Sequence, residues 1–280
     1  MTIEQRRSFS RAVTMGSRAH LQHHHVQSPR WTGPKLSVAV LSDFHVCKPW
    51  VTLGSLGRII EKTNALGADM ILLAGDFIPS RQMPGLREEI PGIARTLARL
   101  EAPLGVHAVL GNHDWWDCAH ARANDFTENL IGPALVDAGI SLLSNRSLSL
   151  SHGGSDFWLV GMDSQWALRS LRKPGFHDPE AAFAEVPEDA PAILLAHEPD
   201  YFSEGDHRAF LQISGHTHGG QMNLGGWRPL TPSHYGGRYA WGHLHEDGRH
   251  LVVSGGIGYS GLPLRVFQPP EITVVTVSAA

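Results

Sequence analysis

Apolar and polar positions follow a regular pattern along the chain from about residue 34 onward. Short apolar runs bounded by polar, glycine-rich turns are typical of buried strands, and apolar residues three or four positions apart are typical of amphipathic helices. The pattern in the first half of the chain therefore predicts strands that alternate with helices. The strands are expected at 36–41, 70–74 and 106–110, and the helices at 53–66, 86–100 and near 124–137.

The second half of the chain is richer in short strands. Strand, helix and strand in succession are typical of right-handed crossover units in a mostly parallel sheet, and two stacked sheets with helices outside would accommodate the remaining strands. We therefore predict one α/β domain over residues 34–280, preceded by a flexible basic arm over residues 1–33. The further strands are expected at 140–143, 147–151, 156–162, 192–196, 211–214, 250–254 and 272–277.

Charge distinguishes the N-terminal arm from the rest of the chain. Residues 1–35 contain six Arg or Lys against one Glu, whereas the whole chain has a net charge of −4 with histidine neutral. This arm is expected either to touch an anionic membrane peripherally or to be a plain disordered tail. Its run Arg6–Arg11 looks like the start of a twin-arginine export signal, but the residues that follow are too polar for such a signal. A cytoplasmic location, with peripheral membrane contact as an alternative, is the resulting prediction.

Composition narrows the class of function. The negative net charge provides no global basic field, so nucleic acid is not expected as a partner. The chain has 18 His, a density that suggests metal chemistry. Its two cysteines, Cys47 and Cys118, are too few for a disulfide framework, and whether they interact stays open, as does the oligomeric state.

Five polar motifs directly follow predicted strands, which is where ligands collect in open α/β sheets. The first, second and fourth are weak signals when taken alone. An aspartate two positions before a histidine often occurs by chance, a carboxylate after a strand can simply cap a helix, and a lone histidine can be structural. The motifs are, in chain order, Asp43-Phe44-His45, Gly75-Asp76, Gly111-Asn112-His113-Asp114, Ala196-His197-Glu198-Pro199 and Ser214-Gly215-His216-Thr217-His218-Gly219-Gly220-Gln221.

Together the motifs supply a mixed set of nitrogen and oxygen ligands. Such a set suits Mn²⁺, Zn²⁺, Fe or Co²⁺ better than Mg²⁺ or Ca²⁺, and the absence of thiolates from it argues against a structural zinc site. Two dications about 3.5–4 Å apart repel strongly, so a bridging carboxylate would be needed to hold both. The candidate ligands are Asp43, His45, Asp76, Asn112, His197, His216 and His218.

In their order, the five motifs resemble the signature of the calcineurin-like metallophosphoesterases, over residues 36–277. The run Gly215–Gln221 resembles the YaeI/YkuE-like branch of that superfamily more closely. The resemblance implies a four-layer αββα sandwich of two mixed β-sheets flanked by helices, and a site for two divalent metal ions. It divides the ligands into three groups: Asp43, His45 and His218 on one ion, Asn112, His197 and His216 on the other, and Asp76 bridging both.

The same resemblance assigns the catalytic residues. His113 is expected to be the histidine that binds no metal and donates a proton to the phosphoryl oxygen or the leaving group, and Asp114 is expected to orient its ring. The implied reaction is hydrolysis of a phosphodiester or pyrophosphate bond by a hydroxide that bridges the metals.

The substrate stays open at this stage. A lipid- or nucleotide-linked substrate similar to UDP-2,3-diacylglucosamine is one alternative, and a cyclic nucleotide or small diester is the second. A non-catalytic metal-binding scaffold is the third, although such scaffolds usually lose ligands and every expected position is filled here.

Several residues outside the ligand set are candidate substrate contacts. Arg265, near the last strand, is expected to contact a phosphate. Trp115 and Trp116 directly follow a metal motif, so they form either an apolar rim for an acyl chain or base, or plain loop packing. A basic cluster over residues 169–173 either steers an anion or is simply solvated.

Overall fold

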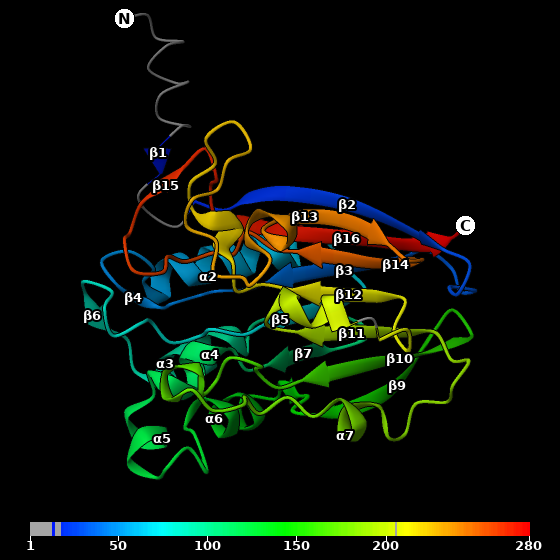
Figure 1. Ribbon diagram of the computed structural model, residues 1–280, viewed down its shortest axis with the longest axis horizontal. Helices are drawn as coiled ribbons and strands as arrows, with labels where there is room; N and C mark the ends of the chain where they lie inside the picture. Colours follow the sequence, from blue (N-terminus) through cyan, green and yellow to red (C-terminus); the bar gives the residue numbers. More distant parts are fainter. Residues whose placement is uncertain (1–12, 15–17, 205) are drawn as a thin grey trace, which may run out of the picture.

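The computed structural model describes residues 13–14, 18–204 and 206–280, so predictions for residues 1–12 and 15–17 lie outside the described residues. Two six-stranded sheets form the centre of the fold (Figure 1). The first sheet is mixed, with β16 antiparallel to β3 and the remaining neighbours parallel. Its strands are, in spatial order, β2 (His20–Ser28), β16 (Glu271–Ala279), β3 (Leu36–Leu41), β5 (Met70–Ala74), β7 (Val106–Val109) and β8 (Ser141–Leu142).

The second sheet is also mixed. Its central strands are parallel, and its two edge strands are antiparallel to their neighbours. In spatial order the strands are β13 (Gly242–Glu246), β14 (Arg249–Val253), β12 (Leu211–Ser214), β11 (Ala192–Ala196), β10 (Ser155–Met162) and β9 (Arg146–His152).

The two sheets pack face to face and bury an apolar layer between them. Along β3, Val38 and Val40 point into this layer, while Ala39 and Leu41 point to the other face of the sheet. Both faces are therefore apolar, which explains the unbroken apolar runs in the sequence. Burial of each large aliphatic side chain stabilises the fold by about 1.5–3 kcal/mol.

Helices cover the outer face of each sheet. The first sheet is covered by α2 (Leu53–Asn64), α3 (Ile90–Leu97) and α6 (Ile131–Asp137), and the second by α7 (Pro179–Phe183) and the 3₁₀ turn η2 (Pro199–Glu204). The predicted four-layer αββα sandwich is thus confirmed. Short elements complete the described fold: α4 (Asn112–Trp116), α5 (Ala119–Ala123), η1 (Arg169–Leu171), η3 (His218–Gly220), η4 (Gly236–Tyr239), and the strand pairs β1 (Val13–Thr14) with β15 (Arg265–Val266) and β4 (Cys47–Lys48) with β6 (Leu86–Arg87).

The first residue of helices α2, α3 and α6 is determined by capping side chains and prolines more than by the spacing of apolar residues. Helix α2 begins where predicted, because the Thr52 side chain accepts from the backbone of Ser55 in a capping box. Helix α3 begins later than predicted because Pro91 lies in its first turn, the only part of a helix where a residue without an N–H fits well. Helix α6 begins late for the same reason, with Pro133 in its first turn.

The prediction of a flexible arm as far as residue 33 is wrong for residues 20–28. These residues form β2, which pairs in parallel with β16 from His20 opposite Glu271 to Ser28 opposite Ala279. Trp31, only 2% exposed, packs beside the sheet against Phe157. The strand escaped prediction because its sequence is mostly polar. The folded domain therefore starts well before residue 34.

The carboxyl ends of the parallel strands meet on one side of the molecule. The arrowheads of β3, β7, β10, β11 and β12 all point toward the side that carries α4 (Figure 1). In the part of the chain that the structure describes, no helix is long and apolar enough to cross a membrane. Cys47 and Cys118 are both buried and free.

Candidate metal centre

The loops that leave five of these strands bring all seven predicted ligands to one buried place. Two ligands follow β3, one follows β5, one follows β7, one follows β11 and two follow β12, so each comes from the same edge of its sheet. All seven side chains are buried, with exposures of 5% or less: Asp43, His45, Asp76, Asn112, His197, His216 and His218.

Five of these ligands have a backbone conformation that is uncommon outside glycine. Each costs on the order of 1 kcal/mol and persists only where the surrounding structure holds it, which is typical of functional sites. The φ angles are 53° at Asp43, 42° at His45, 59° at Asp76, 71° at His216 and 52° at His218.

The glycines that precede two of the ligands allow their loops to touch. A Cβ atom on Gly111 would lie 2.3 Å from Oδ1 of Asp76, and one on Gly75 would lie 2.6 Å from the backbone nitrogen of Gly111. Gly75 also has a φ of 85°. Only glycine fits at these two positions, so the pairs Gly75-Asp76 and Gly111-Asn112 reflect a steric requirement of the site.

One group of ligand atoms surrounds His45. Its Nε2 lies 3.1 Å from Nε2 of His218 and 3.6 Å from Oδ2 of Asp76, and Nε2 of His218 lies 3.5 Å from Oδ1 of Asp43. Nδ1 of His45 donates to the carbonyl of Ile78 at 3.0 Å, which leaves the lone pair on Nε2 directed at the group. Burial lowers the pKa of His45 to about 4, so its ring is neutral, the form that binds metals.

A second group surrounds His197. Its Nε2 lies 3.2 Å from Oδ2 of Asp76, from Oδ1 of Asn112 and from Nδ1 of His216. Nδ1 of His197 donates to the carbonyl of Ala74 at 2.6 Å, so Nε2 again faces the group. Burial, and then the neighbouring His197, lower the pKa of His216 well below its usual value.

Asp76 belongs to both groups, and its Oδ2 has no hydrogen-bond partner among the described residues although it is buried. Burial favours the neutral acid, but the charges of His197 and His113 hold the pKa of Asp76 well below its usual range. A buried, ionised carboxylate oxygen between two groups of imidazole nitrogens is costly unless cations bind there. The residues therefore fit two divalent ions, with Asp76 placed to bridge them.

His113 stands at the edge of the first group. Its ring lies 5.0 Å from that of His45, and one of its nitrogens is within 4.8 Å of ligand atoms of His45 and Asp76. Burial alone would lower the pKa of His113, but the carboxylates of Asp76 and Asp117 outweigh burial and raise it. The ring therefore tends to hold a second proton, which suits a proton donor better than a ligand.

The prediction that Asp114 orients His113 is wrong. Oδ2 of Asp117 lies 2.5 Å from Nδ1 of His113 and takes that role. Adjacent residues on a helix point about 100° apart, whereas residues four apart share one face, so Asp117 and not Asp114 follows His113 around α4. Asp114 instead accepts hydrogen bonds from four backbone N–H groups, those of Asp76, Phe77, Ile78 and Gly111.

A family model for calcineurin-like phosphoesterases matches residues 36–247, well over half of the chain. The chain belongs to the calcineurin-like phosphoesterase family.

Three relatives illustrate the match. A Caenorhabditis elegans protein named as a metallophosphoesterase is 32% identical over 87% of this chain and 48% of its own length. The metallophosphoesterase YkuE of Bacillus subtilis is 30% identical over 86% of this chain and 79% of its own. The phosphodiesterase YaeI of Escherichia coli is 28% identical, with 85% and 80% covered. The chain thus spans about half the length of the first relative and most of the other two.

In this member of the family Arg265 has a structural role, so its predicted phosphate contact is wrong. The side chain is fully buried and donates to the backbone carbonyls of His218, Gly255, Gly256 and Gly258. The donors of the guanidinium are thus used in hydrogen bonds within the protein, and the side chain has no exposed surface that a substrate could contact. Arg265 therefore fixes the loop that carries His218.

The two tryptophans after the third motif have different environments. Trp115 is buried, packs against Phe176 with its ring tilted, and donates from Nε1 to Oδ1 of Asp163. Of the two alternatives for this residue, a substrate rim and plain packing, the structure therefore agrees with packing. Trp116 lies against His113 with ring centroids 5.0 Å apart and donates from Nε1 to Oδ2 of Asp117. Trp116 thus supports the His113–Asp117 pair from the side.

Proposed function

We propose that this phosphoesterase hydrolyses phosphodiester bonds, including pyrophosphate-type bonds, at a centre of two divalent ions. The observation that carries the proposal is the position of the buried Oδ2 of Asp76. This oxygen makes no hydrogen bond to the described residues and lies 3.6 Å from Nε2 of His45 and 3.2 Å from Nε2 of His197. When bound, the ions supply Lewis acidity that acidifies water and offsets the charge of phosphate oxygens.

The ligand set favours a phosphate anion. Only Asp43 and Asp76 among the seven ligands are carboxylates, and the others are imidazoles and one amide. Two divalent ions held this way keep a net positive charge in a buried site, where charge interactions are stronger than in water. The site thus attracts the anionic phosphate and stabilises the negative charge that builds up in the transition state.

His113 supplies the proton in this proposal. Held by Asp117 and flanked by Trp116, it is placed beside the ligand group to protonate the departing oxygen. A positioned proton donor of this kind contributes about 10²–10⁴-fold to the rate. His113 makes this contribution with a side chain that is largely shielded from solvent.

The test is hydrolysis of bis-p-nitrophenyl phosphate against p-nitrophenyl phosphate by apoprotein reloaded in turn with Mn²⁺, Zn²⁺, Co²⁺ or Mg²⁺. We expect metal-dependent turnover of the diester, with little turnover of the monoester. Asp156→Asn, an exposed acid on β10, is the control for Asp76→Asn, which should lose turnover. Binding of two metals without turnover of either ester would favour a non-catalytic scaffold instead.

A further inference from the structure

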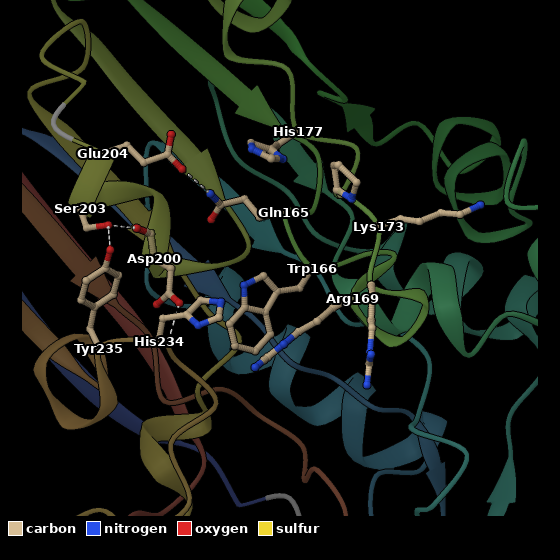
Figure 2. Close-up of a pocket in the computed structure, with 13 residues that line it drawn as sticks. Gln165, Trp166, Arg169, Lys173, His177, Asp200, Ser203, Glu204, His234 and Tyr235 are labelled. Atoms are coloured by element: carbon tan, nitrogen blue, oxygen red, sulfur yellow. Dashed lines mark hydrogen bonds between the residues drawn. The ribbon is translucent and has the colours of Figure 1, made fainter.

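A cavity of about 380 Å³ lies beside the metal centre, between η1 and η2 (Figure 2). Its inner wall is Trp166, whose ring meets that of the candidate ligand His216 edge-on with centroids 4.6 Å apart. The ring of His234 meets Trp166 at 5.1 Å. A single indole therefore separates the cavity from the candidate ligand His216.

One wall of the cavity is cationic. Arg169, Arg172 and Lys173 line it, and all three side chains are exposed. The guanidinium of Arg169 lies over the Trp166 ring, 3.6 Å from its centroid. In the described part of the chain, the ion pairs within 4.0 Å involve other Lys and Arg residues and none of these three. Their charges are therefore available to a ligand.

The acids on the opposite wall are already engaged. Asp200 is buried and accepts from Oγ of Ser233 and from the backbone N–H of His234. Glu204 accepts from Nε2 of Gln165. Figure 2 shows Asp200 beside His234 and Glu204 beside Gln165, on the side of the cavity opposite Arg169 and Lys173. The cavity thus has three cationic side chains without an ion pair and two carboxylates that already accept hydrogen bonds. The excess of positive charge favours an anion as the ligand.

The position of the cavity relative to the metal centre is fixed by Glu198. This buried carboxylate directly follows the candidate ligand His197 and accepts from Oγ of Ser164 at 2.5 Å and from the backbone N–H of Gln165 at 2.9 Å. It thereby ties the loop that carries Trp166 to the end of β11. A group bound in the cavity is consequently held at a constant offset from a phosphate at the metals.

We propose that this cavity, the cationic subsite, binds a second phosphate group carried by the substrate, so that phosphoesters with an additional phosphoryl group are preferred. The inference rests on the proposed function and specifies its substrate class. Arginine pairs with phosphate through two parallel hydrogen bonds, which favours this anion. Stacking of a base is disfavoured, because Trp166 is only 6% exposed and Arg169 covers its face.

Two substrates that differ by one phosphate test the subsite. Thymidine 5′-(p-nitrophenyl phosphate) is compared with its 3′-phosphorylated form, on the metal-loaded protein. We expect kcat/KM to be at least about 10-fold higher for the 3′-phosphorylated ester. A factor of about 10 corresponds to the free energy that one hydrogen bond to a charged group contributes. In Arg172→Ala/Lys173→Ala the ratio of the two values should fall toward one.

A matched control removes the same charge elsewhere. Arg58→Ala/Arg95→Ala takes two exposed cations from α2 and α3, outside the cavity, and should keep the preference. Equal kcat/KM for both esters in the unmodified protein would overturn the subsite while leaving the proposed phosphodiesterase function intact. A preference that survives Arg172→Ala/Lys173→Ala, or that the control loses equally, would also overturn it.

A binding measurement separates the subsite from the reaction. Calorimetry with thymidine 3′,5′-bisphosphate and thymidine 5′-monophosphate needs no turnover, so it decides the point even if neither ester is hydrolysed. Tighter binding of the bisphosphate, reduced about 10-fold or more in the cavity variant, supports the subsite. Equal affinity for the two nucleotides refutes it.

Discussion

Asp117 lies one helical turn after His113 and holds its ring through a 2.5 Å contact between Oδ2 and Nδ1. Arg81 donates to the other oxygen of the same carboxylate at 2.7 Å, which fixes the carboxylate in turn. Asp117 touches none of the seven candidate ligands in these contacts. Its expected role is to position His113 and keep it protonated, so its loss should affect proton donation and leave metal binding in place.

Replacing the carboxylate tests this role. In Asp117→Asn, kcat is expected to fall about 10-fold or more, because the amide holds the ring less firmly and no longer favours its protonated form. The loss should be larger for a diester with an alkoxide leaving group than for one with p-nitrophenolate, which departs readily without a proton. Parallel assays of both esters, with metal content measured by mass spectrometry, check it. Equal losses for the two leaving groups would contradict proton donation.

Asp114 is expected to matter for stability. Its carboxylate accepts from four buried backbone N–H groups at 2.8–3.2 Å, those of Gly111 and of residues 76–78. In Asp114→Asn the amide presents N–H groups to these donors, and the free energy of unfolding should fall by about 3 kcal/mol. Urea unfolding measures the change. Asp137→Asn, at an exposed acid of α6, is the control and should stay within about 0.5 kcal/mol of the unmodified protein.

Metal binding should stabilise the protein against unfolding, because the seven candidate ligands lie close together in the folded state and are far apart in the unfolded chain. A metal at 100 times its dissociation constant adds about 2.7 kcal/mol. We expect Mn²⁺ or Zn²⁺ to raise the melting temperature of the apoprotein, and chelation to reverse the rise. In Asp76→Asn the side chain loses its negative charge and one of its two oxygens, so the bound metal should fall below two ions per chain and the thermal shift should shrink. An unchanged stoichiometry of two would argue against bridging by Asp76.

The sequence predicts which side chains gather at the candidate metal centre because each follows a buried strand. Asp76 follows an apolar run that can only be an interior strand, and His197 does likewise, so their places in the sheet are set by local pattern. His113 and Asp117 differ in this respect. Their pairing depends on where α4 begins. A helix of five residues is too short to show apolar periodicity, so the sequence does not predict its first residue.

Strand β2 shows a second limit of sequence patterns. Its residues His20–Ser28 are mostly polar, so alternation of apolar and polar positions is nearly absent, and only Val26 is a buried aliphatic residue. What holds the strand is its backbone pairing with β16, which composition does not reveal. Trp115 is a similar case, since the burial of this tryptophan in the short helix α4 depends on partners distant in sequence, Phe176 and Asp163.

Removing residues 1–30 should therefore destabilise the fold. The deletion takes away β2, leaving the hydrogen-bonding edge of β16 open to solvent and to pairing with other chains. We expect a lower melting temperature and a tendency to aggregate, seen by calorimetry and light scattering. A variant lacking only residues 1–12 is the comparison, and the difference between the two reports the joint contribution of β1 and β2. Equal melting temperatures for both deletions would show that the strand adds little.

The peripheral lipid contact proposed for the basic arm needs a test that keeps β2. Replacing Arg6, Arg7 and Arg11 by glutamine removes three positive charges and leaves residues 20–28 unchanged. Each lysine or arginine near an anionic surface contributes about 1 kcal/mol. Co-sedimentation with phosphatidylserine vesicles should fall steeply in the triple variant if the arm binds them. Equal sedimentation would assign any binding to another part of the protein.

Arg265 supports the loop of His218 from within, and its replacement separates that role from substrate binding. Lysine has three donors where arginine has five, so Arg265→Lys leaves buried carbonyls unpaired, among them those of Gly255 and Gly258. The free energy of unfolding should fall by about 2–4 kcal/mol, and metal affinity with it. Arg146→Lys, at an exposed position of β9, should change neither. A raised KM with stability and metal affinity unchanged would instead indicate a phosphate contact, which the complete burial of the guanidinium opposes.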